Sequence, residues 1–240
     1  MKLPLLALGL MALGTAACTN STADEETRPE WVTGAWTSGE STLFLQHDGT
    51  YVTMNSDLWD GGGTWGVSGS NLIVRPSSSR SSMSIQLQPV VGCSLVKMDR
   101  YWMARPNNPA ADCPNPEPAL TDSEQCVAGS YSRHVDRSVR SNDWTHGDYI
   151  DTDDFTVTLA SEHFYEMTAK HFDTNGYVSH RGYGFVMGRW ELDDAGRVHL
   201  VPLVYDNLAE APTEQSVVVS TQGAKRTFDG ATYDFVGGCK

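Results

Sequence analysis

The sequence has few basic residues for its length. Its 240 residues include 17 Lys and Arg against 30 Asp and Glu, which gives a formal net charge of -13. Because basic side chains supply the attraction that holds proteins on nucleic acids, no nucleic-acid partner is expected. Hydrophobic residues make up 40% of the chain and charged residues 20%, a composition that predicts a folded core rather than disorder.

Motifs of several common catalytic sites are also absent from the sequence. It has no G-x-S-x-G elbow that would expose a serine nucleophile. The run Gly61-Gly62-Gly63 is followed by Thr64 and Trp65, not by the lysine of a phosphate-binding loop. No cysteine has a second cysteine or a histidine at the short spacing of a zinc site. The sequence therefore assigns no catalytic residue and no cofactor, and it leaves enzyme activity open.

The only long hydrophobic run lies at the start of the chain. Residues 1–17 contain one positive charge at Lys2, an apolar run from Leu3 to Leu13, and small residues up to Ala17. This order is typical of a secretory signal peptide. The run is shorter than the ~20 residues that span a bilayer, so removal of residues 1–17 is expected.

Cys18 directly follows the small residues, and this arrangement resembles the bacterial lipoprotein box. The resemblance implies cleavage before Cys18, diacylation of its thiol and a fatty acid such as palmitate on the new amino terminus. Thr15 departs from the pattern, in which leucine is commonest. Thr19 after the cysteine, by resemblance to enteric sorting, implies the outer membrane. The alternative is ordinary signal cleavage nearby, with Cys18 left as a thiol. Residues 18–30 are polar and acidic and are expected to form a flexible tether.

Four other cysteines remain in a compartment that favours disulfides, so two disulfides are predicted. Of the three possible pairings, the spacing favours Cys93 with Cys113 and Cys126 with Cys239. Each of these disulfides then closes one half of the chain.

Five prolines between Pro106 and Pro118 divide the chain into two parts. We expect a first domain over residues 31–105, a linker over 106–125, and a larger, acidic second domain over 126–240. In the first domain, Asp48-Gly49 is the tight turn of a predicted hairpin. Further short alternating runs bring the total to about eight strands. We therefore predict an all-β fold in which an up-and-down barrel closes the edges and is filled by its own side chains, with more room in the second domain.

The second half repeats the order of the first with longer connections. The triplet at residues 129–131, Gly-Ser-Tyr, corresponds to Gly-Ala-Trp at 34–36, and Gly-Arg-Trp at 188–190 corresponds to Gly-Thr-Trp at 63–65. This repeat predicts two tandem antiparallel barrels. The alternative is coincidence, because such triplets are common in strands.

The patterns G-x-W, L-x-L-x-x-D-G-T-Y, G-T-W and L-x-V resemble the small lipocalin-like (calycin-type) barrels of many bacterial lipoproteins. The match covers residues 31–105 and, more loosely, 126–240. The resemblance implies a lipid-anchored binding or envelope-associated module and no enzyme activity.

Six of the seven histidines lie in the second half, which raises the question of a metal site. The weak candidates are His163, His199, Asp151 and Asp153. His163 and His171 are expected on one strand, eight residues or roughly 26 Å apart, too far for one ion. The acidic run around Asp151 and Asp153 lacks the closing residues of a calcium loop. No metal is therefore predicted.

Tryptophans are numerous, with seven in the chain. Four of them, at positions 36, 65, 102 and 190, lie in predicted strands and are expected in the core. Trp59 and Trp144 lie in polar segments and are the better ligand-binding candidates, able to stack on a sugar or anchor a protein.

Together these features predict a lipid-anchored lipoprotein of the bacterial cell envelope that acts as a binding or structural module. Its ligand, whether small molecule, glycan or protein, is left open. One alternative is a metal-dependent or hydrolytic enzyme that uses His and Asp residues of the second half. A second alternative is an assembly factor that contacts a protein of the envelope.

Overall fold

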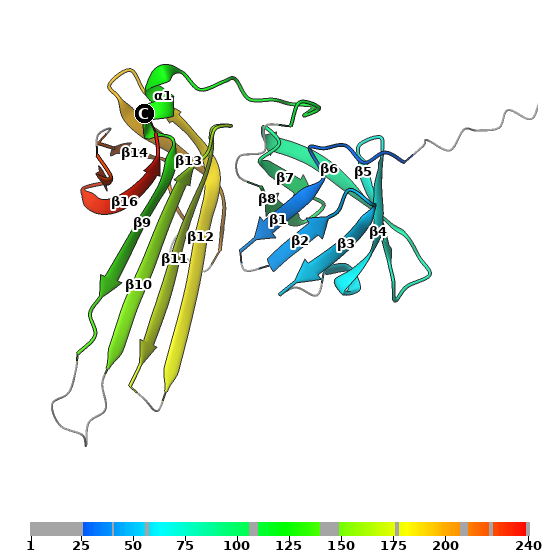
Figure 1. Ribbon diagram of the computed structural model, residues 1–240, viewed down its shortest axis with the longest axis horizontal. Coiled ribbons are helices and arrows are strands. Elements are labelled where there is room, and N and C mark those ends of the chain that lie inside the picture. The colour runs from blue at the N-terminus through cyan, green and yellow to red at the C-terminus, as the bar shows by residue number, and fades with distance from the viewer. Residues whose placement is uncertain are drawn as a thin grey trace, which may run out of the picture.

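The computed structural model describes residues 26–39, 41–55, 58–105, 110–139, 149–175, 178–206, 211–220 and 223–238. Within these residues the chain folds into two tandem eight-stranded antiparallel barrels, with one short α-helix between them (Figure 1). The predicted all-β class and the tandem barrels are confirmed. No helix among these residues is both long and apolar enough to cross a bilayer.

The first barrel is closed. Its strands are β1 (Gly34–Ser38), β2 (Ser41–Leu45), β3 (Thr50–Met54), β4 (Gly62–Ser68), β5 (Asn71–Pro76), β6 (Met83–Val91), β7 (Leu95–Met98) and β8 (Tyr101–Ala104). Each strand pairs with the next, and β1 returns to β8 where Thr37 lies opposite Ala104. The predicted hairpin turn joins β2 to β3, and there Asp48 accepts a hydrogen bond from the backbone N–H of Thr50 at 2.8 Å.

The second barrel is nearly closed and has longer strands. They are β9 (Gly129–Asp136), β10 (Ile150–Leu159), β11 (Phe164–Thr174), β12 (Ser179–Leu192), β13 (Arg197–Asp206), β14 (Gln215–Val218), β15 (Lys225–Phe228) and β16 (Ala231–Gly237). The hydrogen-bonded order starts at β14 and ends at β15. A single bridge between Val219 and Phe228 connects these two ends. Strands β9 to β12 run side by side well beyond the rest of the barrel (Figure 1).

Buried aromatic residues at the start of each barrel show that the two halves are repeats. The indole N–H of Trp36 donates to the carbonyl of Val32 at 2.7 Å. The hydroxyl of Tyr131 donates to the carbonyl of Val127 at 2.5 Å. Both partners lie four residues before the aromatic residue, so Tyr131 occupies in β9 the place that Trp36 has in β1. The correspondence predicted from the sequence is confirmed here.

The fourth strand of each barrel shows the same equivalence. Trp65 in β4 donates its indole N–H to the carbonyl of Gln46, and Trp190 in β12 donates to that of Ala160, both at 3.0 Å. Each acceptor is the first residue after the second strand of its barrel. Both tryptophans are fully buried. The repeated Gly-x-Trp triplet therefore marks one structural position in two copies.

A glycine is required two residues before each of these tryptophans. A Cβ atom on Gly63 would lie 2.1 Å from the carbonyl oxygen of Arg75, and one on Gly188 would lie 2.0 Å from that of Val201. Such distances are far inside van der Waals contact, so only glycine lets the neighbouring strand approach this closely.

The two barrels have separate cores and also share a contact. Trp36 belongs to the core of the first barrel and Trp190 to that of the second. A third apolar cluster lies between the barrels and contains Val91, Leu95 and Ala104 from the first and Ala160, Phe164, Phe185 and Met187 from the second. Trp102, which was predicted in the core, is only half-buried and packs at this interface.

Polar contacts reinforce the same interface. The hydroxyl of Ser94 donates to the buried carboxylate of Glu162 at 2.6 Å. Glu117 of the linker accepts from the backbone N–H of Gly92 at 3.3 Å and from Arg189 at 2.8 Å. One linker residue therefore touches both barrels.

A disulfide ties the linker to the first barrel. Cys93 pairs with Cys113, as the spacing favoured. Cys126 lies in the helix α1 (Asp122–Val127) and is also disulfide-bonded. Its predicted partner, Cys239, lies outside the described residues. The neighbouring Gly238 is close to Cys126, since a Cβ atom on it would lie 2.9 Å from the carbonyl oxygen of Cys126.

Candidate functional site

The rim of the first barrel contains a hollow of about 630 Å³, which we call the rim hollow. Alternate connections of an up-and-down barrel emerge at the same end, and three of them, β3 to β4, β5 to β6 and β7 to β8, line this hollow. The core of the first barrel contains buried side chains such as Trp36, Leu43 and Trp65. The expectation that side chains fill the barrel concerns its interior, whereas this hollow is lined by the connections at its rim.

Unusual backbone conformations gather at the rim hollow. Trp59, Asp60 and Asp99 all line it, and their φ angles are +51°, +57° and +56°. These left-handed conformations are costly for residues other than glycine and persist where the surrounding structure holds them. Here the Trp59 carbonyl accepts a hydrogen bond from the Tyr51 hydroxyl at 2.5 Å, and the two rings meet edge to face. Strain of this kind is typical of functional sites.

The side chains of the rim hollow combine aromatic and charged groups. Trp59 and Tyr101 supply aromatic rings, while Asp60, Asp99 and Arg100 supply charges. Arg100 donates to the Tyr101 hydroxyl at 2.7 Å. A ring-shaped ligand can place an apolar face on an aromatic ring while its hydroxyl groups bond to carboxylate and guanidinium groups. The chemistry of the hollow therefore suits a sugar.

The hydroxyl of Tyr51 stays neutral. Burial raises its pKa to about 12, and the negative charge of Asp60 adds to this effect. The hydroxyl therefore stays protonated and keeps donating to Trp59. Of the two tryptophans predicted to bind a ligand, Trp59 is placed at a hollow, whereas Trp144 lies outside the described residues.

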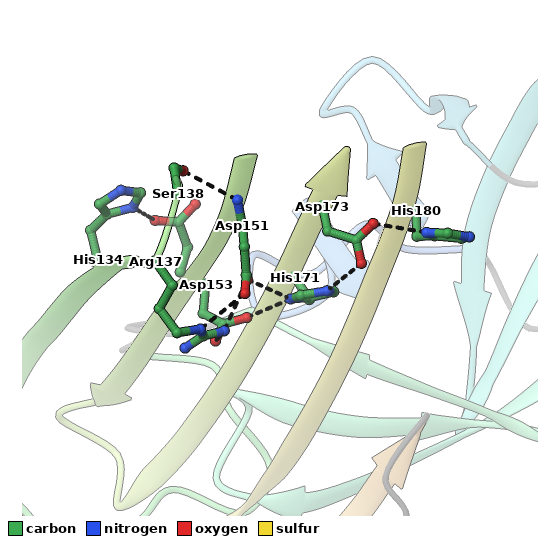
Figure 2. Close-up of polar contacts among 9 residues, drawn as sticks. His134, Arg137, Ser138, Asp151, Asp153, His171, Asp173 and His180 are labelled. Carbon is green, nitrogen blue, oxygen red and sulfur yellow. Dashed lines mark hydrogen bonds and ion pairs between the residues drawn. The ribbon is translucent and has the colours of Figure 1, made fainter. Parts of the chain in front are cut away.

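A second cluster of polar side chains crosses the long strands of the second barrel (Figure 2). Asp153 of β10 lies directly opposite His171 of β11. His171 contacts Asp153 through Nδ1 at 2.8 Å and Asp173 through Nε2 at 3.2 Å. Asp173 in turn contacts Nδ1 of His180 in β12 at 2.8 Å. Acidic and basic groups thus alternate across three strands.

Arg137 completes this cluster on the side of β9. Its guanidinium lies 3.0 Å from Asp151 and 2.5 Å from Asp153 (Figure 2). The hydrogen bond from Arg137 holds the pKa of Asp153 below its usual value, and His171 adds to the effect. Hydrogen bonds to Asp153 and Asp173 raise the pKa of His171. We call the six residues the charge ladder: Arg137, Asp151, Asp153, His171, Asp173 and His180.

The charge ladder contains a set of possible metal ligands. Atoms of Asp151, Asp153 and His171 all lie within 4.8 Å of one another. Two carboxylates and an imidazole are suitable donors for a transition metal. Arg137 already neutralises both carboxylates, so an ion would have to displace it. Asp151 and Asp153 are thus brought together as candidates, and His171 is the ligand that the sequence reasoning missed.

The histidines proposed as metal candidates lie elsewhere. The prediction that His163 and His171 share one strand was wrong. His163 lies in the turn before β11, with a φ of +56°. It is buried, its Nε2 lies 3.1 Å from Glu124, and its ring packs on Trp190. His199 contacts Ser216 at 3.2 Å. Neither histidine belongs to the charge ladder.

The protein consists of two tandem eight-stranded antiparallel barrels, of which the second is nearly closed. Comparison with family models, with curated proteins and with solved structures finds no match for the chain. The lipocalin-like interpretation thus depends on the residues and strands described above.

Proposed function

We propose that the protein is a lipid-anchored lipoprotein of the bacterial outer membrane and that its tandem lipocalin-like barrels form a binding module. The signal-like residues 1–17 and the cysteine at position 18 support the anchor. Cys18 lies nine residues before Thr27, which pairs with Val67 of β4. Nine residues span at most about 30 Å, so the anchor would hold the first barrel close to the bilayer.

We further propose that the rim hollow is the binding site and that its ligand is a sugar. The observation that carries this proposal is Trp59, a bulky residue held in a left-handed conformation at the edge of the hollow. Because a small or flexible residue would be easier to accommodate there, the cost of placing a tryptophan favours a role in contacting a ligand.

The test of the binding site is a screen of the mature, disulfide-bonded chain against an array of soluble oligosaccharides. We expect Trp59→Ala to weaken binding of any hit at least about tenfold, a loss of ~1.4 kcal/mol. A matched control is Tyr205→Ala, which removes an exposed aromatic residue of the second barrel. An array without a hit, or a folded Trp59→Ala variant that binds as tightly as the wild type, contradicts the proposal.

The anchor needs a separate test. In cells, Cys18→Ser should move the protein from the membrane fraction to the soluble fraction, and the wild-type amino-terminal peptide should carry the mass of acyl chains. A wild-type protein without that mass, or a variant that stays with the membrane, rules out the anchor.

One observation favours a second function, that of a metal-dependent enzyme. It is the grouping of Asp151, Asp153 and His171. Stoichiometric metal in the purified protein that is lost in His171→Ala would support this function. Metal content that is unchanged in the variant would count against it.

A further inference from the structure

The outer face of the second barrel carries a polar groove of about 460 Å³, which we call the outer groove. Its floor comes from neighbouring strands. Thr158 lies opposite Glu166, and Thr156 lies between Thr168 on one side and Ser132 on the other. In β10, Thr156 and Thr158 alternate with the buried residues Val157 and Leu159. The floor residues therefore point away from the core.

The side chains on the floor of the groove are polar. Among the described residues, none forms a hydrogen bond or ion pair with the carboxylate of Glu166, or a hydrogen bond with the hydroxyls of Ser132, Thr156, Thr158 and Thr168. Except for Ser132, these residues are half-buried. Polar groups in such positions require partners, which must come from solvent or from a ligand.

The charges around the groove single out Glu166. Glu166 belongs to β11, and the other two acidic residues that line the groove are already paired: Asp154 of β10 with His134 at 2.7 Å, and Asp234 of β16 with Lys225 at 3.5 Å. Lys170 lies four residues after Glu166 on the same face, but its ammonium lies 5.7 Å from the ring centroid of Tyr183 and forms no ion pair with a described residue. Burial raises the pKa of the Glu166 carboxyl, and the positive charge of Lys170 offsets this effect only in part.

A cationic ligand would compensate that charge. An ammonium group placed on Glu166 forms a charge-assisted hydrogen bond, which is stronger than one between neutral groups. The neighbouring hydroxyls both donate and accept, so they match hydroxyl groups of a ligand. We propose that the outer groove binds a small hydroxylated amine, such as an amino sugar, with its ammonium on Glu166 and its hydroxyls on Thr156, Thr158 and Thr168.

This site is separate from the rim hollow, because it lies on the other barrel and uses charge instead of aromatic stacking. The two proposals can therefore fail independently. The neighbouring part of the same face, with Phe164, Phe185 and Met187, packs against the first barrel. That contact fixes one side of the groove, so little ordering of the protein is needed on binding.

The test uses three probes that differ at one substituent: glucosamine, N-acetylglucosamine and glucose. Binding to the full mature chain is measured by calorimetry and by NMR shifts of backbone amides. We expect glucosamine to bind at least about tenfold more tightly than the other two, with shifts in β10 and β11. Equal affinity for the three probes, or shifts confined to the first barrel, overturns the proposal.

Variants then assign the ammonium contact. Glu166→Gln keeps the shape of the side chain and should abolish the preference for glucosamine. Thr158→Val should weaken the binding of glucosamine but keep the preference for it over glucose, because the charge of Glu166 remains. Glu191→Gln removes an exposed carboxylate of the same barrel and should change nothing. A preference that survives in Glu166→Gln, or one lost in Trp59→Ala instead, contradicts the assignment.

Discussion

Replacement of Trp190 or Trp65 by phenylalanine tests whether the two barrels have separate cores. Trp190→Phe removes the N–H that bonds to Ala160 and leaves a buried carbonyl without its partner, which costs about 1–3 kcal/mol. The smaller ring also leaves a cavity of about 40 Å³, which at ~24 cal/mol per Å³ costs roughly 1 kcal/mol. Trp65→Phe has the same geometry in the first barrel. Each variant should therefore lose about 2–4 kcal/mol of stability, well below the ~5–15 kcal/mol of a typical domain.

Native-state amide hydrogen exchange separates the two barrels in one experiment, because it reports the opening free energy of each strand. We expect Trp190→Phe to lower protection in β9 to β16 and to leave β1 to β8 within about 0.5 kcal/mol of the wild type, as expected for distant sites. Trp65→Phe should do the reverse. If either variant lowers the amide protection of both sets of strands equally, the two barrels unfold as one unit, and their separate cores are not thermodynamically independent.

Three other predictions follow from the contacts described above. Because Asp153 and Asp173 raise the pKa of His171, the stability that these contacts supply is complete below the ordinary value of about 6.5 and is lost as the pH rises through the raised value. Urea unfolding of the wild type should show this loss, and that of His171→Asn should not. Burial raises the pKa of Glu162, so its folded form retains the proton longer and stability should fall as the pH rises from about 4.5. Glu162→Gln should flatten that slope in the same measurement, and an unchanged slope would assign it to another group. Removing the disulfide of Cys93 and Cys113, which are 20 residues apart, by a double change to alanine should cost about 3 kcal/mol in urea unfolding. A loss below about 1 kcal/mol would show that the linker is held by its other contacts.

The barrels could be predicted from the sequence because their signals are local. Alternation of apolar residues, the Asp48-Gly49 turn and the repeated Gly-x-Trp triplets each act within one strand or hairpin. The separate buried positions of Trp65 and Trp190 follow from these signals. Strand count and order needed only the further condition that edges must close.

The candidate sites could not be predicted in the same way. The contact between His171 and Asp153 depends on the register of β10 against β11, which the turn between them sets. The spacing i, i+2 in Asp151-x-Asp153 and in His171-x-Asp173 was the available signal, since it puts each pair on one face. The rim hollow was missed because its connections use left-handed tryptophan and aspartate, whereas sequence reasoning expects glycine or asparagine in that conformation.

The length of the strands explains why charge gathers in the second barrel. The corresponding strands β2 and β10 have 5 and 10 residues. The extra residues of β10 extend past the core, where no facing strand can bury them (Figure 1). Asp151 and Asp153 continue the inward-facing alternation of Val157 and Leu159, so the face that is apolar inside the barrel becomes ionic beyond it. Asp151 and Asp153 then need basic neighbours, which Arg137, just after β9, and His171 of β11 supply. The ladder is therefore the polar extension of the core, whereas Glu166 in the outer groove forms no ion pair with a described residue, and its proposed partner is a ligand.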